Sequence, residues 1–456
     1  MGVSESDVEY ITGASISGTK RLGAVFTFSE KNVTSRVGIS HLSSKKACES
    51  LDREISDKTT LQSLVDKAKS RWNDQVFSKV QISSTNAADL NLLYSNIYGM
   101  SLLPSNLTGE NPGWKSTEPY YSDIFTLWDT HRCHTPLFHI LQPVAYEEFI
   151  RSLIDIWRHD GFMPDARSSN FNGRVQGGSN ADNVLADAYV KGVRGGVNWG
   201  DGYQAMVTDA EKVPPNNNDP KAPDSSTKEG RGALPDWIKY GYITPAYTRA
   251  VSRAVEYSGN DFGLYQVAKG LGKTADAEKY LNRSRNWRNH WDRNCSSNGH
   301  SGFVVPRKAD GSFVAQDPLN CGGCYWGDAY YEDNSWVYSM NVAHDAAELV
   351  TRIGGPDKFV DRIDKMFSLN IFKAANEPGF TSPFMYNFVR GKQHKSVERS
   401  RQISKLYNAN AGGLPGNSDA GAMESNILWQ MIGLWPVSAT FNCSLSLRID
   451  TYRFTR

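Results

Sequence analysis

The spacing of apolar positions divides the chain near residue 59. Before that point, residues 22–28 and 37–39 alternate between apolar and polar side chains, which is typical of β-strands. Two or three strands cannot bury their own apolar face. We therefore expect residues 1–55 to be the last part of a β-domain whose other strands precede this sequence.

From Thr59 onward, apolar residues recur every three or four positions, as they do along amphipathic helices. This spacing predicts about a dozen helices before Pro436 and hardly any strand. Parallel strands would stand out as Val- and Ile-rich runs between helices, so a helical toroid is favoured over a βα fold. The expected helices lie near residues 61–68, 90–97, 123–140, 149–157, 183–192, 201–208, 245–257, 261–269, 275–291, 335–350, 357–367, 398–406 and 422–433.

Two segments depart from the helical pattern. Residues 213–231 contain a Pro- and Asn-rich run, which predicts a solvated loop. Residues 441–449 alternate again and predict one amphipathic strand. Such a strand needs neighbouring strands to be stable.

Composition narrows the possible partners. The 456 residues allow about three domains, and 50 basic against 49 acidic side chains leave a net charge of +1. A nearly neutral chain lacks the field that nucleic acid or an anionic membrane surface requires, and no apolar run is long enough to span a bilayer. We therefore expect neither nucleic acid nor a membrane as a partner. The aromatic content of 11% suits sugar faces as well as a protein core.

Two opposing indications bear on the compartment. Six cysteines and five Asn-X-Ser/Thr sequons are compatible with secretion, whereas the first residues contain no basic-then-apolar leader and so allow the cytosol. Cys321 and Cys324 form a CxxC pair without a second such pair. A local disulfide is therefore favoured over a zinc or redox site.

The first candidate for chemistry is Glu332, which lies among aromatic residues such as Trp326 and Tyr331. Walls of low dielectric constant disfavour the charged carboxylate, so the pKa of the group rises and it can hold a proton near neutral pH. A general acid needs this property. Alternatively, Glu332 is a solvated residue ahead of a helix capped by Asp333 or Asn334.

Two turns offer further carboxylates. A glycine-rich turn at residues 412–421 leads into an expected helix and presents Asn417 and Asp419. Asp419 could act in catalysis or serve only as the N-cap of that helix. The turn at Asn376 and Glu377 crowds side-chain and backbone oxygens, which suit calcium, although the spacing matches no EF-hand. A plain turn is the alternative.

A fourth group surrounds Trp128. Asp129 and Arg132 lie three residues apart beside this ring. Together they could grip vicinal sugar hydroxyls while the ring stacks on the sugar, or the two charges could form an ion pair. His131 and His134 complete no metal-ligand pattern and are expected to pack or to form hydrogen bonds. The polar residues of the stretch 176–192 predict a rim that faces a ligand.

Five segments together resemble glycoside hydrolase family 92. In chain order they are residues 122–130 (SDIFTLWDT), 177–182 (GGSNAD), 186–192 (ADAYVKG), 376–378 (NEP) and 413–423 (GLPGNSDAGAM). Members of this family are calcium-dependent, exo-acting α-mannosidases. The resemblance implies a mainly α-helical chain, with an (α/α)6 barrel that follows a β-sandwich and a linker helix.

The resemblance also implies a role for each candidate residue. Glu332 takes the place of the general acid and Asp419 that of the general base in an inverting hydrolysis, and calcium falls near Asn376 and Glu377. The expected substrate is terminal α-linked mannose of N-glycans and mannoproteins. The residues implied to line the pocket of the terminal sugar are Trp128, Asp129, Arg132, Asp187 and Asn417.

The same analogy divides the chain into four parts. Residues 1–55 are expected to be a remnant of the sandwich, 56–80 the linker helix, 81–437 the catalytic domain and 438–456 a shortened β-segment. Both ends fall short of the family pattern, so a truncated, catalytically weak mannoside-binding protein is the alternative function. A redox or zinc protein built on Cys321 and Cys324 is a third.

Overall fold

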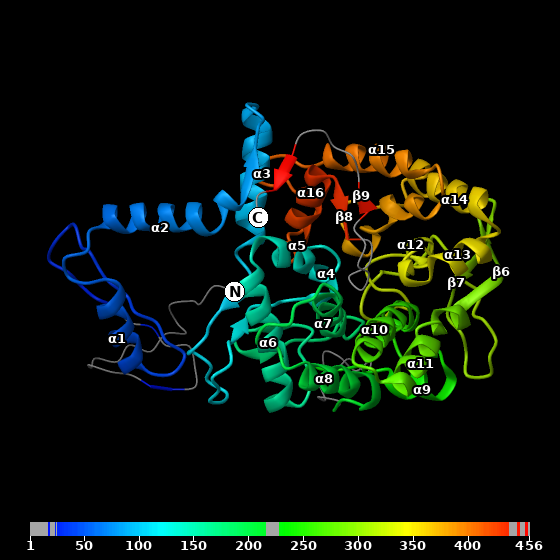
Figure 1. Cartoon of the computed structure of the whole chain (residues 1–456), viewed down its shortest axis with the longest axis horizontal. Coiled ribbons are helices and arrows are strands. Elements are labelled where there is room, and N and C mark those ends of the chain that lie inside the picture. The colour runs from blue at the N-terminus through cyan, green and yellow to red at the C-terminus, as the bar shows by residue number, and fades with distance from the viewer. Residues whose placement is uncertain are drawn as a thin grey trace. The chain divides into compact units, whose positions relative to one another are not determined.

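The chain forms two units, Met1–Thr59 and Thr60–Arg456. The computed structural model describes residues 17–18, 23, 25–215, 228–436, 445–446 and 452–454. Figure 1 shows a mainly helical chain, which confirms the predicted fold class at that level. Its arrangement as an (α/α)6 barrel stays a prediction.

The first unit contains one helix, α1 (Ser44–Glu54), among its described residues. The Ser43 Oγ atom caps this helix by accepting a hydrogen bond from the Lys46 N–H at 3.1 Å. The predicted strands at 22–28 and 37–39 are wrong for the described positions, which are not paired into strands. Val25 and Phe26 are 80% and 74% exposed, and none of the described strands pairs with them, so the alternation alone formed no strand.

The second unit contains the remaining helices. Its first helix, α2 (Leu61–Gln75), lies in the range expected for the linker. The others are α3 (Ala87–Met100), α4 (Leu127–Thr130), α5 (His134–Leu141), α6 (Pro143–Asp160), α7 (Ala181–Val190), α8 (Trp199–Glu211), α9 (Leu234–Tyr240), α10 (Ala250–Gly270), α11 (Thr274–Arg283), α12 (Ser335–Tyr338), α13 (Ala346–Ile353), α14 (Pro356–Ser368), α15 (Gln393–Ser404) and α16 (Ala422–Ile432).

Several helix boundaries differ from the prediction: α9 was not expected, and the helix expected at 335–350 is divided into α12 and α13. The two helices expected at 245–257 and 261–269 are one continuous helix, α10, which packs against α7, α8 and α11 (Figure 1). The helix expected at 123–140 is divided into α4 and α5. The helix expected to continue to residue 291 stops at Arg283 and is followed by a short 3-10 helix, Asn286–His290.

A β-hairpin follows this 3-10 helix, in a part of the chain where the sequence predicted hardly any strand. Strand β6 (Trp291–Ser297) pairs antiparallel with β7 (His300–Val304), and Ser297 faces His300 across the turn. The two turn residues, Asn298 and Gly299, have φ angles of 50° and 83°. An Asn-Gly pair with both residues in the left-handed region is the signature of a type I′ hairpin, so this element was detectable in the sequence.

The remaining strands are short and form two-stranded pairs. They are β1 (Val80–Ile82) with β10 (Tyr452–Phe454), β2 (Ser105–Asn106) with β3 (Tyr121–Ser122), β4 (Arg167–Ser168) with β5 (Phe171–Asn172), and β8 (Leu434–Trp435) with β9 (Leu445–Ser446). Of the strand expected at 441–449, only β9 falls within the described residues, and β8 is its neighbour. Residues 213–215 and 228–231 form no helix or strand, as expected of the loop at 213–231, whose other residues lie outside the described part.

Two large buried clusters, with a third and smaller one around Trp237, pack the second unit. One gathers residues of α3, α5, α14, α16 and β7, and the other gathers residues of α6, α7, α8 and the end of α10. The short helix α4 lies where the clusters meet, because Trp128 belongs to the first and Leu127 to the second. Side chains of α4 are therefore held by both cores. None of the described helices is long and apolar enough to cross a membrane.

Candidate active site

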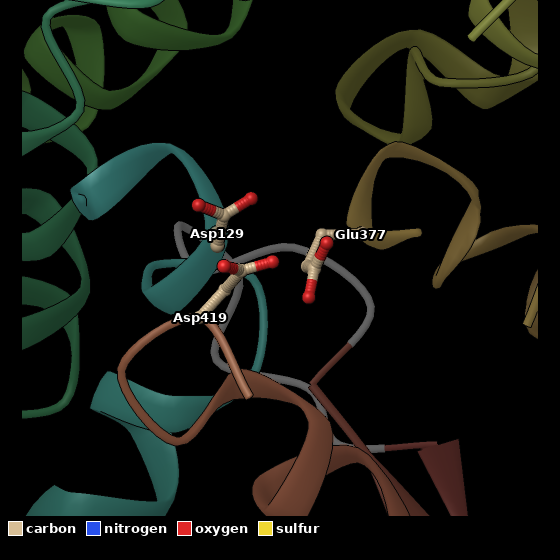
Figure 2. Close-up of side chains that lie close together, drawn as sticks. All are labelled: Asp129, Glu377 and Asp419. Carbon is tan, nitrogen blue, oxygen red and sulfur yellow. The ribbon is translucent and has the colours of Figure 1, made fainter. Parts of the chain in front are cut away.

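Three carboxylates converge from distant parts of the sequence. Asp129 lies on α4, Glu377 begins the 3-10 helix Glu377–Gly379, and Asp419 lies in the loop ahead of α16. One oxygen atom from each lies within 4.8 Å of the others (Figure 2). Asp129 and Glu377 are 3% and 1% exposed, whereas Asp419 is half-buried. We call these three residues the carboxylate cluster.

The loop that carries Asp419 has an unusual backbone. Asp419 and Ala420 have φ angles of 44° and 58°, in a region that non-glycine residues enter only when their surroundings require it. Gly421, not Asp419, is the N-cap residue of α16, and no side chain caps that helix. The interpretation of Asp419 as a helix cap is therefore wrong. Its carboxylate is directed into the cluster (Figure 2).

The backbone of Glu332 is fixed on both sides. Its φ angle is 65°, its N–H donates to the Cys324 carbonyl at 2.7 Å, and its own carbonyl accepts from the Asn376 Nδ2 atom at 2.6 Å. Cys324 forms the predicted local disulfide with Cys321. The disulfide loop and the turn at Asn376 thus fix the main chain of Glu332, and with it the position of the Glu332 side chain.

The Glu332 side chain has two donors. The Trp128 Nε1 atom donates to Oε2 at 2.7 Å, and the Gln176 Nε2 atom lies 3.4 Å from Oε1. Asn334, and not Glu332, caps α12 by accepting from the Val337 N–H at 3.3 Å. The predicted cap is therefore present, but Glu332 is not the solvated residue that the alternative interpretation required.

Burial raises the pKa of Glu332 to about 7, with the Asp419 charge acting in the same direction and the Trp128 hydrogen bond opposing it. Burial and the neighbouring carboxylates also raise the pKa values of Asp129 and Glu377 well above their usual range. Burial raises the pKa of Asp419. Like charges this close cannot all be ionised without a compensating positive charge, so the cluster binds either protons or a cation.

The donor set suits a hard divalent cation. Carboxylate oxygens are the ligands that calcium prefers, and the cluster supplies three such groups. The Glu377 Oε1 atom is buried and has no hydrogen-bond partner among the described residues. Of the two predicted calcium ligands, Glu377 lies in the cluster, whereas the Asn376 side-chain amide donates to the Glu332 carbonyl.

Trp128 and Arg132 are buried next to the site. The Trp128 side chain has no exposed surface, so the predicted stacking of its ring on a sugar is not available in this conformation. Arg132 is also buried; its Nη2 atom pairs with Glu256 Oε1 at 2.7 Å, and its Nε atom donates to the Trp128 carbonyl at 2.9 Å. The acidic partner of Arg132 is thus Glu256, and the alternative of an ion pair with Asp129 is wrong.

The other two predicted sugar contacts are placed differently. Asp187 is fully buried on α7, where its Oδ1 atom pairs with the Lys191 Nζ atom at 2.6 Å. Burial raises its pKa to about 6, and Lys191 opposes this rise. No recorded contact between described residues joins Asp187 to the carboxylate cluster. Asn417 is exposed, two residues ahead of Asp419.

Comparison with known proteins identifies the family. Residues 46–445 match the glycosyl hydrolase family 92 catalytic domain. The chain belongs to this family.

Three similar proteins each match most of this chain. An uncharacterized secreted glycosidase of Arthroderma benhamiae is 34% identical over 430 residues, which are 89% of this chain and 51% of that protein. The GH92 inverting mannosidase of Bacteroides thetaiotaomicron VPI-5482 matches with a TM-score of 0.76 and 24% identity, over 88% of this chain and 56% of that chain. A GH92 α-mannosidase of the same species, in complex with mannoimidazole, matches with a TM-score of 0.78 and 22% identity, over 89% and 54%. The chain spans about half the length of these relatives.

Two further residues belong to this candidate site: Gln176, which the sequence predicted only as the first residue of a rim that faces a ligand, and Glu256, which it did not predict. Gln176 accepts from the Thr126 hydroxyl, and its Nε2 atom lies 3.2 Å from the Tyr331 hydroxyl and 3.4 Å from Glu332. Gln176 begins the polar stretch 176–192, and the polar composition of that stretch was the signal in the sequence. Glu256 lies within α10, and its pairing with Arg132, 124 residues away, had no local signal.

The two histidines beside α4 behave as expected. His131 Nδ1 lies 2.7 Å from the Leu127 carbonyl, and His134 Nε2 lies 2.9 Å from the Met100 carbonyl. Burial, the larger cause, and the Arg132 charge lower the pKa of His131 to about 3. Both rings are thus neutral hydrogen-bonding groups within the core.

Proposed function

We propose that this chain carries the active site of a glycosidase that releases terminal α-linked mannose with inversion at the anomeric carbon. Membership of family 92 and similarity to solved structures of GH92 mannosidases support the reaction class. The observation that carries the proposal is the pairing of a buried carboxyl of raised pKa, Glu332, with a second carboxyl, Asp419, whose charge influences it.

Each carboxyl has a distinct part in the proposed mechanism. Glu332 holds a proton near neutral pH and donates it to the departing glycosidic oxygen. Asp419 accepts a proton from the water that attacks the opposite face of the anomeric carbon. A separation of about 6.5–9.5 Å between the two carboxyls leaves room for this water, whereas a retaining pair lies about 5–5.5 Å apart.

Calcium is the proposed cofactor. Glu377, with oxygen atoms of the turn at Asn376, would hold the ion, and Asp129 and Asp419 face the same space. Bound calcium supplies positive charge that orients the hydroxyls of the terminal sugar. Asp129 is proposed to bind one of these hydroxyls, and Trp128, Arg132 and Gln176 act through Glu332 by positioning it.

The substrate and the compartment are proposed by analogy. One solved relative is a complex with mannoimidazole, which supports mannose-containing glycans or glycoproteins as substrates. The curated relative is described as secreted, which supports export of this protein. The alternative, a mannoside-binding protein without turnover, lacks an observation in its favour, because both proposed catalytic carboxyls are present, Glu332 with a raised pKa and Asp419 half-buried in the carboxylate cluster.

Two conservative variants test the proposal. Glu332→Gln cannot donate a carboxyl proton and Asp419→Asn cannot accept one, so each should lower kcat on an α-linked mannobiose by about 10²–10⁴-fold. Unchanged thermal unfolding in both variants would show that the loss is chemical. Wild-type turnover in either variant would refute its assignment, and a wild-type chain that binds mannobiose without releasing mannose would establish the alternative function.

A further inference from the structure

The disulfide between Cys321 and Cys324 closes a short loop beside the proposed general acid. The two residues between the cysteines, Gly322 and Gly323, are exposed, and both cysteines are half-buried, so the loop is open to a small reductant. The Cys324 carbonyl is the recorded acceptor for the Glu332 N–H, at 2.7 Å. The disulfide is therefore joined to the main chain of Glu332 through one residue and one hydrogen bond.

Both residues that share this hydrogen bond have a left-handed backbone. The φ angle is 52° at Cys324 and 65° at Glu332. Residues other than glycine adopt this conformation at a cost in free energy and keep it only where their surroundings fix it. At Cys324 the disulfide does so together with a hydrogen bond from the Cys324 N–H to the Cys321 carbonyl at 3.3 Å. Breaking the disulfide removes the covalent part of this restraint.

Asp328 holds the same loop without help from the disulfide. Its Oδ2 atom accepts from the N–H groups of Gly323 and Tyr325 at 3.0 and 2.8 Å. Its carbonyl accepts from the Arg249 N–H, just ahead of α10, at 2.5 Å. Because these contacts remain after reduction, we expect loss of the disulfide to change the local backbone of residues 321–325 and to leave the fold intact.

The other contacts of Glu332 do not replace the hydrogen bond to Cys324. Asn376 donates to the Glu332 carbonyl and Trp128 donates to its side chain, so neither contact engages the N–H. When Cys324 relaxes, the Glu332 N–H loses its acceptor and the main chain is free to rotate. A displacement of about 1 Å in a catalytic group can cost about 10²-fold in rate.

We propose that the Cys321–Cys324 disulfide is a positioning element for Glu332, and that its reduction selectively slows the step in which the leaving group is protonated. This inference rests on the role proposed for Glu332 above. It makes turnover of glycosides dependent on the redox state of one accessible bond.

The reduction itself is a two-electron exchange with an external dithiol such as dithiothreitol. One thiolate of the reductant attacks a sulfur of the protein disulfide and displaces the other cysteine as a thiolate. The second thiolate of the reductant then closes the reductant's own disulfide and releases the first cysteine. The S–S bond of the protein breaks, one S–S bond forms in the reductant, and Cys321 and Cys324 take up the two protons that the reductant loses.

Two substrates with different leaving groups test the inference. An α-linked mannobiose needs a proton on its leaving oxygen, whereas an α-mannosyl fluoride does not. Treating the whole chain with dithiothreitol in the presence of calcium should lower kcat on mannobiose at least tenfold. The KM for mannobiose and the kcat on the fluoride should each change less than twofold, because binding and the attack of water do not use the Glu332 proton.

Two variants identify the disulfide responsible. Cys321→Ala combined with Cys324→Ala should show the same selective loss without the reductant and no further loss with it. Cys48→Ala removes an exposed free cysteine on α1 and is the matched control, which should respond to dithiothreitol as the wild type does. Melting temperatures should differ by less than about 4 °C among these proteins, since closing so short a loop adds little stability.

The outcomes separate this inference from the proposed function. Equal losses on both substrates, no loss on mannobiose, or a reductant effect that persists without Cys321 and Cys324 would each overturn the inference while leaving the proposed function in place. A wild-type chain that hydrolyses neither substrate would refute the proposed function and this inference with it.

Discussion

Two groups of buried carboxyls in the second unit differ in what neutralises them. Asp182 on α7 and Asp261 on α10 contact Arg231 at 2.9 and 2.7 Å, and Arg283 contacts Asp261 at 2.7 Å. Burial acts to raise the pKa of Asp261, but the two arginines together hold it below its usual value. In this group, which we call the arginine network, burial raises the pKa of Asp182 to about 6 although Arg231 opposes the rise, so Asp261 is the carboxyl that the protein's own charges compensate fully.

The carboxylate cluster is not compensated in this way. Burial raises the pKa values of Asp129 and Glu377 well above the usual range, and the neighbouring Arg132 is already paired with Glu256. An uncompensated group of buried charges costs stability and is retained where a ligand or a reaction uses it. Asp261 is thus neutralised within the protein, whereas the carboxylate cluster needs protons or a cation to neutralise it.

The largest stability effect is expected in the arginine network. Arg231→Leu leaves Asp182 buried without its charged partner and deprives Asp261 of one, which should cost about 3–5 kcal/mol in the free energy of unfolding. Arg285→Leu, at an exposed position, is the control and should change stability by less than about 1 kcal/mol. Chemical denaturation of both variants measures the difference. A small loss in Arg231→Leu would show that the network is not structural in this sense.

A smaller loss is expected at Gly177, which packs on the Trp128 ring. A Cβ atom there would lie 2.1 Å from the Trp128 Cζ3 atom, so Gly177→Ala should cost about 1–3 kcal/mol and displace the indole N–H from Glu332. Gly259→Ala on α10 is the matched control, because its Cβ would meet nothing within 4 Å, and it should gain about 1 kcal/mol. Equal stability changes in the two variants would contradict this packing.

The helices, the candidate site and the hairpin differ in how far the sequence alone could predict them. The helical period found most of the helices, and the aromatic neighbours of Glu332 and the glycines before Asp419 indicated the two catalytic candidates. The Asn298-Gly299 hairpin carried a local signal that the reading missed. In contrast, the partners of Trp128 and Arg132 lie 204 and 124 residues away, and no local pattern encodes such contacts. The alternation of apolar and polar residues near Phe26 predicted a strand wrongly, because a strand also needs a neighbouring strand that supplies hydrogen bonds.

The pH dependence of turnover follows from the raised pKa of Glu332. A general acid must carry its proton, so kcat/KM should fall about tenfold per pH unit as the pH rises above about 7. This fall above pH 7 is expected with mannobiose as the substrate. It should be absent with an α-mannosyl fluoride, because fluoride leaves without needing a proton. An identical alkaline limb for both substrates would assign it to another group.

The smallest stability effect is expected in the carboxylate cluster. Glu377→Gln removes one of several repelling charges, so without added calcium the melting temperature should be unchanged or higher, in contrast to Arg231→Leu. Calcium is expected to raise the melting temperature of the wild-type chain, and the same variant should lose this rise. Retention of that calcium-dependent rise would exclude Glu377 as a ligand.

The anomeric form of the first released sugar distinguishes inverting from retaining hydrolysis. The whole chain would be mixed with calcium and an α-linked mannobiose, and the first product would be followed by proton NMR before mutarotation mixes the two anomers. Inverting hydrolysis predicts that β-mannose appears first and that the α-anomer grows in later. Initial release of α-mannose, or binding of the disaccharide with no release, would contradict it.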